Sequence, residues 1–122
     1  MKISEAMTRD VRMVRPDQTI REAAELMAQM AIGALPVQEN DRLVGMITDR
    51  DIAVRAVAEG RSPDTKVREV MSNEIKYCFE DQSVEEVTRN MGEQRLRRLP
   101  VLSRDKRLVG ILALGDLALQ RS

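Results

Sequence analysis

Few side chains in this 122-residue chain are suited to catalysis, and their types narrow the choice of function. There is no histidine and only one cysteine, Cys78. Serine–histidine and cysteine–histidine catalysis, histidine-ligated metals, cysteine zinc sites and internal disulfides are therefore excluded. The adjacent carboxylates Glu85 and Glu86 lie at a predicted helix start, where the helix dipole accounts for them. We expect no catalytic residue and no metal ligand.

A threonine and an aspartate three residues apart, Thr48 and Asp51, form the most informative polar pair. They follow Gly45 and an apolar run, so they are predicted to lie where a strand passes into a helix. A carboxylate in a first helical turn can accept hydrogen bonds from two neighbouring hydroxyls, and a threonine beside free N–H groups can hold an anion. The same spacing is that of a capping box, which only stabilises a helix start. Both interpretations stay open.

The sequence repeats itself at an offset of 64 residues, which becomes 65 after one extra residue in the second copy. The copies span 1–60 and 65–122, and a loop containing Gly60 and Pro63 joins them. The matching pairs are Met7-Thr8 with Met71-Ser72, Leu35-Pro36-Val37 with Leu99-Pro100-Val101, Arg42–Gly45 with Arg107–Gly110, and Asp51 with Asp116.

Each copy is predicted to have the order β-α-β-β-α after a short helical turn at 3–7 or 67–71. Capping boxes at Thr19-x-x-Glu22 and Ser83-x-x-Glu86 begin the first helices. First strands are predicted at 11–15 and 75–79, hairpins at 34–47 and 99–112 with polar turns, and closing helices at 49–59 and 115–121. The apolar helix faces are Ile20, Ala23, Ala24, Met27, Met30 and Ala31 in copy one, and Val84, Val87 and Met91 in copy two. The predicted shared core contains Leu35, Val37, Val44, Ile47, Leu99, Val101, Val109 and Leu112.

The Met-Thr/Ser start, capping box, Pro-Val strand and Gly-x-x-x-x-x-Asp junction occur twice and in register. Together they resemble a tandem pair of cystathionine-beta-synthase (CBS) domains over almost the whole chain. The resemblance implies an α+β, α/β-like fold of two β-α-β-β-α units related by a pseudo-two-fold axis. It also implies a regulatory module that binds an adenosine-containing ligand such as AMP, ATP, NAD or S-adenosylmethionine and requires no cofactor. Dimers of such pairs are expected through apolar positions of the closing helices, which are Ile52, Val54, Val57, Leu117 and Leu119.

The family's nucleotide motif matches copy one at Gly45, Met46, Thr48 and Asp51, whereas Ala113 replaces the hydroxyl before Asp116 in copy two. In this family the opposite copy completes each site. The stronger site is therefore expected to comprise Met46, Thr48, Arg50, Asp51, Ile75, Lys76, Tyr77, Arg97 and Arg98. The weaker one comprises Val11, Arg12, Met13, Gly33, Ala34 and Asp116. The arginines either bind phosphate or are solvated surface charges.

Three functions compete: a nucleotide-sensing module, a dimerisation or interaction module with vestigial clefts, and an enzyme. The intact motif in copy one favours the first, and the missing histidine and metal-ligand clusters disfavour the third. Twenty basic and 20 acidic residues give no net charge, so nucleic acid is not an expected partner. There is no long apolar run, and the start of the chain is highly charged, so we expect a cytoplasmic protein that does not enter a membrane. Nothing in the sequence specifies a downstream protein.

Overall fold

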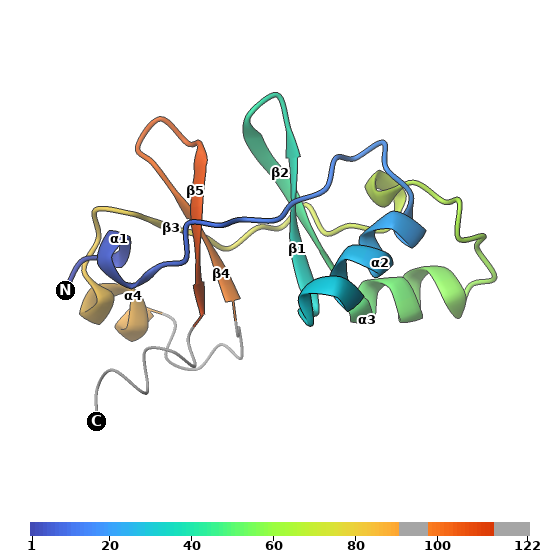
Figure 1. Ribbon diagram of the computed structural model, residues 1–122, viewed down its shortest axis with the longest axis horizontal. Helices are drawn as coiled ribbons and strands as arrows, with labels where there is room; N and C mark the ends of the chain where they lie inside the picture. The colour runs from blue at the N-terminus through green and yellow to red at the C-terminus, as the bar shows by residue number, and fades with distance from the viewer. Residues whose placement is uncertain (91–97, 114–122) are drawn as a thin grey trace. The chain divides into compact units, whose positions relative to one another are not determined.

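A computed structural model of the chain describes residues 1–90 and 98–113, and these form parts of two compact units (Figure 1). The repeat-one unit comprises Arg12–Ile75. The repeat-two unit comprises Met1–Val11 together with Lys76–Ser122. Each unit thus contains the hairpin of one sequence repeat, and the first segment of each repeat belongs to the other repeat's unit.

In the repeat-one unit, helix α2 (Ile20–Met30) begins at the predicted capping box. The Thr19 side chain accepts from the Glu22 backbone N–H at 3.1 Å, and Thr19 N donates to the Glu22 carboxylate at 3.3 Å. The buried stripe is narrower than predicted, because it contains Ile20, Ala23 and Met27 while Ala24, Met30 and Ala31 are exposed. Ala24 lies at the edge of the stripe, and the helix ends at Ala31, where the backbone turns left-handed with φ 54°.

The hairpin of the repeat-one unit joins β1 (Ala34–Glu39) to β2 (Arg42–Thr48). The strands are antiparallel, with Ala34 opposite Thr48 and Glu39 opposite Arg42. The predicted polar turn is confirmed, and both of its residues, Asn40 and Asp41, have positive φ, as a two-residue turn between twisted strands requires. The chain then continues into α3 (Asp49–Asp51), the π-helical η1 (Ile52–Val57) and, after a loop, η2 (Val67–Glu69).

The repeat-two unit contains α1 (Ile3–Ala6), β3 (Cys78–Phe79), α4 (Val84–Asn90), β4 (Arg98–Leu102) and β5 (Leu108–Ala113). Its sheet has the order β3-β4-β5, in which β3 runs parallel and β5 antiparallel to β4. The α4 face is buried at Val84 and Val87. Met91, Arg97 and the predicted closing helix at 115–121 lie outside the described residues.

The first strands are shorter than predicted. In the 11–15 segment only Val14 pairs, through N–H donation to Pro36 O at 3.0 Å and acceptance from Gln38 N at 2.9 Å. Its neighbours Met13 and Arg15 are exposed, and the next residue, Pro16, has no N–H to extend a ladder. Within 75–79 the strand is β3 alone.

The first segment of each repeat packs into the unit of the other repeat. Val67 and Val70 are fully buried in the repeat-one unit, and Ser72 exchanges two hydrogen bonds with Met46 of β2, at 2.8 and 3.0 Å. Gly45 permits this approach, because a Cβ there would lie 2.8 Å from both Met71 Sδ and Ser72 O.

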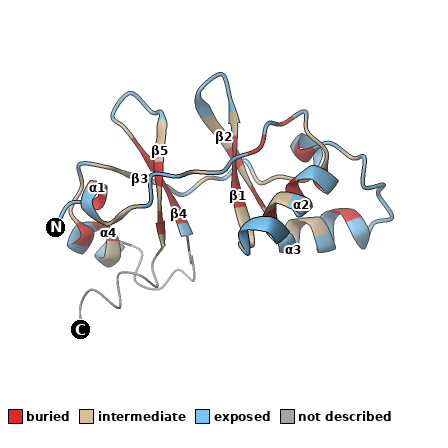
Figure 2. Ribbon diagram, viewed as in Figure 1, coloured by how far each residue is buried: buried red, intermediate tan, exposed pale blue. Residues whose placement is uncertain are grey.

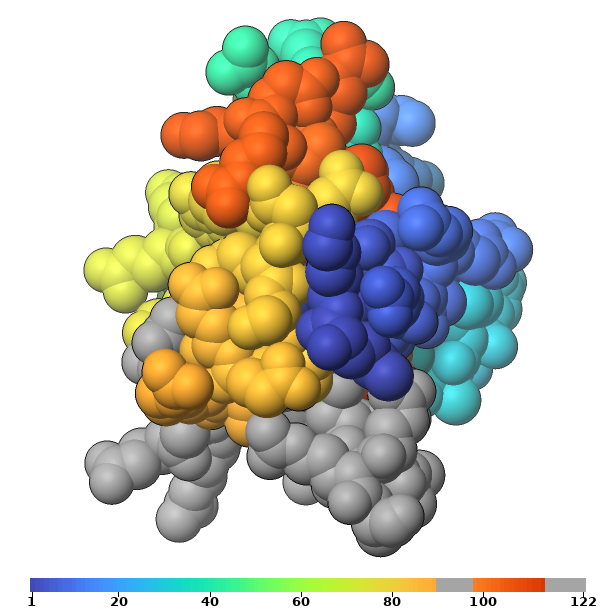
Figure 3. All heavy atoms as spheres, turned by 90° about the vertical axis from the view of Figure 1, so that its left-hand side faces the viewer, coloured from blue at the N-terminus to red at the C-terminus, as the bar shows by residue number. Residues whose placement is uncertain are grey.

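The repeat-two unit uses the N-terminal segment in the same way. Ile3 is fully buried against Val84 and its neighbours, and Thr8 exchanges two hydrogen bonds with Ile111 of β5, at 2.8 and 2.9 Å. Figure 3 shows the N-terminal residues lying directly against the segment that contains α4, where Val84 N donates to Met1 O at 2.8 Å. One edge of each hairpin is therefore paired with residues from the first segment of the other repeat.

The predicted core residues are divided between the units (Figure 2). Leu35, Val37 and Ile47 are buried in the repeat-one unit, and Leu99, Val101 and Leu112 are buried in the repeat-two unit. Val44 and Val109 are only half-buried and pack against these clusters. Each unit therefore has a core of its own.

Candidate functional site

Thr48 and Asp51 lie at the junction of β2 and α3 and are both half-buried. Thr48 N donates to Asp51 Oδ2 at 3.0 Å, and Asp51 N donates to Thr48 Oγ1 at 3.0 Å. The pair is therefore a capping box, as one of the two interpretations required. Among the described residues, none donates a hydrogen bond to Asp51 Oδ1. Within the part of the chain that the structure describes, the Thr48 O–H also donates no hydrogen bond, so neither group is used there by another residue.

The free N–H groups that we expected beside Thr48 are already used. Asp49 N donates to Gly33 O at 2.9 Å, Arg50 N donates to Asp49 Oδ1 at 2.8 Å, and Asp51 N donates to Thr48 Oγ1. A phosphate at this helix start would have to displace one of these bonds or be held by side chains. The expectation of a backbone anion site is therefore wrong for this conformation.

The helical winding changes from α to π immediately after Asp51. Asp49–Asp51 is α-helical, but Ile52–Val57 winds as a π-helix. Such wide turns are rare and occur frequently near functional sites, because they re-aim the side chains before them. Arg55 anchors the turn through an Nη1 hydrogen bond to Met71 O at 3.1 Å, while Arg50 is exposed.

Gly33 and Ala34 lie beside Thr48 within the repeat-one unit. Ala34 is the cross-strand partner of Thr48, and a Cβ on Gly33 would approach Asp49 Oδ2 to 2.8 Å. The sequence assigned these two residues to the weaker site with Asp116, which lies outside the described residues. In their own unit they shape the backbone around the Thr48 junction.

In the repeat-two unit, Arg98 occupies the position that Ala34 has in the repeat-one unit. It begins β4, is exposed, and lies across the strands from Ala113, the residue that replaces the threonine. Arg97 lies outside the described residues.

The remaining predicted site residues are mostly accessible. Met46, Ile75 and Val11 are half-buried. Lys76, Tyr77, Arg12 and Met13 are exposed. The structure thus joins Thr48, Asp51, Arg50 and Met46 in one unit, and Lys76, Tyr77 and Arg98 belong to the other.

Cys78 is buried, and its Sγ lies 3.9 Å from Pro100 O. Burial raises the pKa of this thiol to about 12, so it is protonated at neutral pH. Because the thiolate is the reactive form, the buried and protonated Cys78 is a packing residue of β3.

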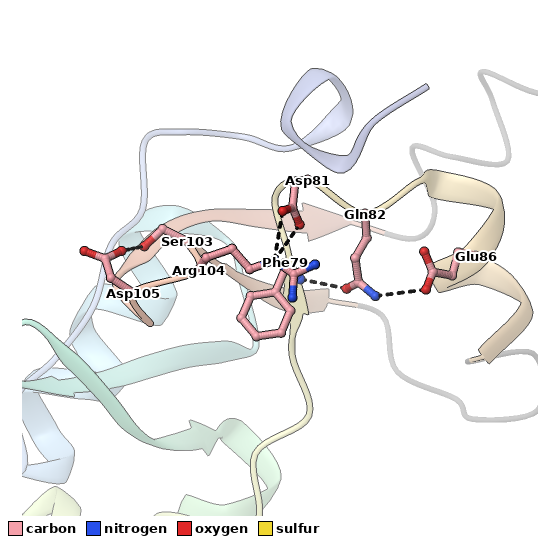
Figure 4. A network of polar contacts seen from close by, with 7 residues as sticks. All are labelled: Phe79, Asp81, Gln82, Glu86, Ser103, Arg104 and Asp105. Carbon is pink, nitrogen blue, oxygen red and sulfur yellow. Dashed lines mark hydrogen bonds and ion pairs between the residues drawn. The ribbon is translucent and has the colours of Figure 1, made fainter.

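Sequence reasoning missed a polar cluster in the repeat-two unit, formed by Phe79, Asp81, Gln82 and Arg104 (Figure 4). Arg104 Nε contacts both carboxylate oxygens of Asp81, at 3.0 and 2.8 Å, and the guanidinium carbon lies 4.2 Å from the Phe79 ring centroid. The Arg104 hydrogen bond is the main cause that lowers the pKa of Asp81. The signal in the sequence was the extra residue in the turn of copy two, which lengthens the turn that carries Arg104.

A family model described as the CBS domain matches residues 3–57 and 67–120. The chain belongs to the CBS domain family. Over 119 residues it is 47% identical to the CBS domain-containing protein YhcV of Bacillus subtilis, covering 98% of this chain and 84% of that protein. The repeats recognised from the sequence are thus two CBS repeats, and the predicted α+β class is confirmed.

Solved CBS structures share this fold over nearly the whole chain. Hypoxic response protein I with two coordinated zinc ions aligns with TM-score 0.86 and 37% identity, covering 98% of each chain. CBSX2 in complex with AMP aligns with TM-score 0.83 and 26% identity, covering 98% of this chain and 97% of that one. The CBS domain pair of MJ0100, in complex with 5′-methylthioadenosine and S-adenosyl-L-methionine, gives TM-score 0.83 and 26% identity, covering 99% and 95%.

The histidine and cysteine donors typical of structural zinc sites are scarce in this CBS pair. Structural zinc sites use histidine and cysteine, but this chain has no histidine and one buried cysteine. Within residues 1–90 and 98–113 no three His, Cys, Asp or Glu side chains are grouped as a metal site would require. In the same ranges no helix has the length and apolar character needed to span a membrane.

Proposed function

We propose that this CBS pair is a regulatory module that binds an adenosine-containing nucleotide, with Thr48 and Asp51 as its central ligand contacts. The observation that carries the proposal is Asp51 Oδ1, which has no hydrogen-bond partner among the described residues and lies beside the Thr48 hydroxyl, at a junction whose residues match the nucleotide motif. Solved CBS relatives hold AMP or S-adenosylmethionine, which supports the same ligand class here.

Asp51 Oδ1 is proposed to accept hydrogen bonds from the ribose hydroxyls. A charged acceptor makes stronger hydrogen bonds than a neutral one, so this contact contributes specificity for a sugar diol. Met46 precedes the pair on β2, and Arg50 lies between Thr48 and Asp51 in α3; both side chains have solvent-accessible surface.

Phosphate is proposed to be held by side chains, because the N–H groups of Asp49, Arg50 and Asp51 are already donated. The family resemblance assigns this role to Arg97 and Arg98, and the base contacts to Ile75, Lys76 and Tyr77. Arg98 and Tyr77 are exposed in the repeat-two unit, so neither is already committed to a core. The second site, with Asp116, is proposed to be weaker because Ala113 offers no hydroxyl.

A thermal-shift panel with AMP, ADP, ATP, NAD and S-adenosylmethionine tests this function. A ligand that binds only the native state raises Tm, because it stabilises that state by about 2.7 kcal/mol when its concentration is a hundred times Kd. Adenosine-containing ligands are expected to raise Tm, and GMP serves as the control. Unchanged Tm across the panel at millimolar ligand contradicts the proposal.

A second candidate function is assembly of two CBS pairs into a homodimer. The observation that favours it is the exposed apolar surface of η1, where Val54 is 48% and Val57 67% exposed. An unpartnered apolar helix face of this kind is a common interface. Light scattering at high micromolar concentration is expected to give twice the monomer mass, and a Val57→Glu variant is expected to give the monomer mass.

A further inference from the structure

The chain has one tyrosine, one phenylalanine and no tryptophan, and both aromatic residues lie in the same short segment. The rings of Tyr77 and Phe79 meet edge to face, with centroids 5.6 Å apart and an interplanar angle of 88°. Tyr77 is nevertheless 41% exposed. This arrangement keeps a large ring at the surface while fixing one side of it against Phe79.

The Phe79 ring also contacts Arg104, whose guanidinium carbon lies 4.2 Å from the ring centroid. Asp81 fixes that guanidinium with both carboxylate oxygens, at 3.0 and 2.8 Å from Nε. The backbone of Phe79 is fixed too, because its N–H donates to Gln82 Oε1 at 2.8 Å (Figure 4). Phe79 is thus held by a cation–π contact with Arg104, and the ion pair with Asp81 in turn holds Arg104.

The first repeat has no such arrangement. The residues that match Tyr77 and Phe79 at the offset of 64 are Met13 and Arg15, and Arg15 itself pairs with Asp17 at 3.5 Å. The hairpin turn of repeat one has two residues and no arginine. The extra turn residue and the Arg-to-Phe exchange therefore belong to repeat two alone, where together they support a tyrosine.

We propose that Phe79, fixed by Arg104 and Asp81, is a positioning residue for Tyr77, whose exposed ring has the base contact already assigned to it under the proposed function. The proposal rests on the function proposed above and adds to it a clamp that lies outside the ligand motif. A ring held in place loses less conformational freedom on binding than a free one, so the clamp raises affinity for the base.

A double-mutant cycle on AMP affinity tests the clamp, using Tyr77→Ala, Arg104→Ala and the double variant in calorimetric titrations. Base stacking on an aromatic ring predicts a loss of about tenfold for Tyr77→Ala. Loss of an ordered aromatic pair predicts about threefold for Arg104→Ala. Because Arg104 acts only through Tyr77, adding Arg104→Ala to Tyr77→Ala is expected to change affinity no further.

Near-ultraviolet circular dichroism provides a readout that follows only the ring. There is no tryptophan, so the tyrosine band reports Tyr77 directly, and it is expected to weaken in Arg104→Ala. Arg107→Ala is the matched control, because Arg107 is 65% exposed against 62% for Arg104, belongs to the same turn, and pairs with Asp105 rather than Asp81. It is expected to leave both the band and the affinity unchanged.

Two results overturn the inference in distinguishable ways. If the parent binds AMP but the two losses are additive, or Arg104→Ala binds AMP as the parent does, the clamp is wrong and the proposed function stands. If the parent binds neither AMP nor S-adenosylmethionine, the proposed function itself fails and the inference fails with it.

Discussion

Thr48 and Asp51 hold each other by two hydrogen bonds of 3.0 Å, one in each direction, and leave one aspartate oxygen without a partner among the described residues. Thr19 and Glu22 form the same box at the start of α2, where the exposed Glu22 carboxylate also accepts two hydrogen bonds beyond the box, from Gln18 Nε2 and Thr19 Oγ1. The two boxes are chemically similar, yet only the first occupies a nucleotide motif. Comparing them separates capping from ligand binding.

Replacing either capping threonine by alanine is expected to destabilise the protein by about 1 kcal/mol, because one helix-start N–H loses its partner. Only Thr48→Ala is expected to weaken AMP binding as well. Urea unfolding measures the first effect and calorimetry the second. Equal AMP affinity in Thr48→Ala and Thr19→Ala would remove Thr48 from the site.

Arginine side chains are expected to make affinity depend on phosphate. A hydrogen bond to a charged group contributes about 1.5–3 kcal/mol, so Arg98→Ala should weaken AMP binding by about tenfold or more. Adenosine binding should hardly change, and added salt should weaken AMP binding less in the variant than in the parent. Arg107→Ala is again the control. An Arg97→Ala/Arg98→Ala protein that binds AMP like its parent shows that both are surface charges.

The N-terminal segment, which packs in the repeat-two unit, is expected to contribute to the stability of the protein. Ile3 is fully buried in the core of the repeat-two unit, so Ile3→Ala should lower the free energy of unfolding by about 2–5 kcal/mol. Met1→Ala, at a residue 58% exposed, should cost little. Urea unfolding of the full chain measures both. A loss below 1 kcal/mol for Ile3→Ala would mean that the segment contributes little to the unit, because surface positions typically show such small changes.

The Cys78 thiol is expected to resist modification in the native state. Burial raises its pKa to about 12, so the reactive thiolate is scarce at pH 8 and increases only as the pH approaches that value. The free energy of unfolding depends on pH for the same reason. The thiol of the unfolded chain ionises near pH 8.5, so the native state becomes less stable as the pH rises from about 8.5 toward 12. Labelling with a disulfide reagent should be slow in buffer and fast in urea. Equal rates contradict the buried assignment.

Local signals explain what the sequence predicted correctly. The Thr19–Glu22 capping box, the Asn40-Asp41 turn and the hairpin strands each depend on residues a few positions apart. Packing between segments far apart in the sequence was not predictable in this way. Ile3 shares a core cluster with Val84, and Val67 shares the other with Val14. The first helical turn of each repeat thus contributes apolar side chains to the core of the other repeat's unit.

In the candidate site too, local features were predictable and contacts between distant residues were not. The Thr48–Asp51 box was recognisable from its spacing. The hydrogen bond from Asp49 N to Gly33 O was not recognisable in this way, because only the folded hairpin brings these two residues together. The stacking of Arg104 on Phe79 depends on a turn geometry set by one extra residue and by the positive φ of Lys106.

Calorimetric titration of AMP into the parent, Asp51→Ala and Asp116→Ala proteins tests the central claim most directly. The parent is expected to show a main binding event that Asp51→Ala weakens by about tenfold or more, since Asp51 supplies charged hydrogen bonds to the ribose. Asp116→Ala is expected to retain that event. Retention of the main event in Asp51→Ala, together with its loss in Asp116→Ala, would contradict the assignment of the ligand to Thr48 and Asp51.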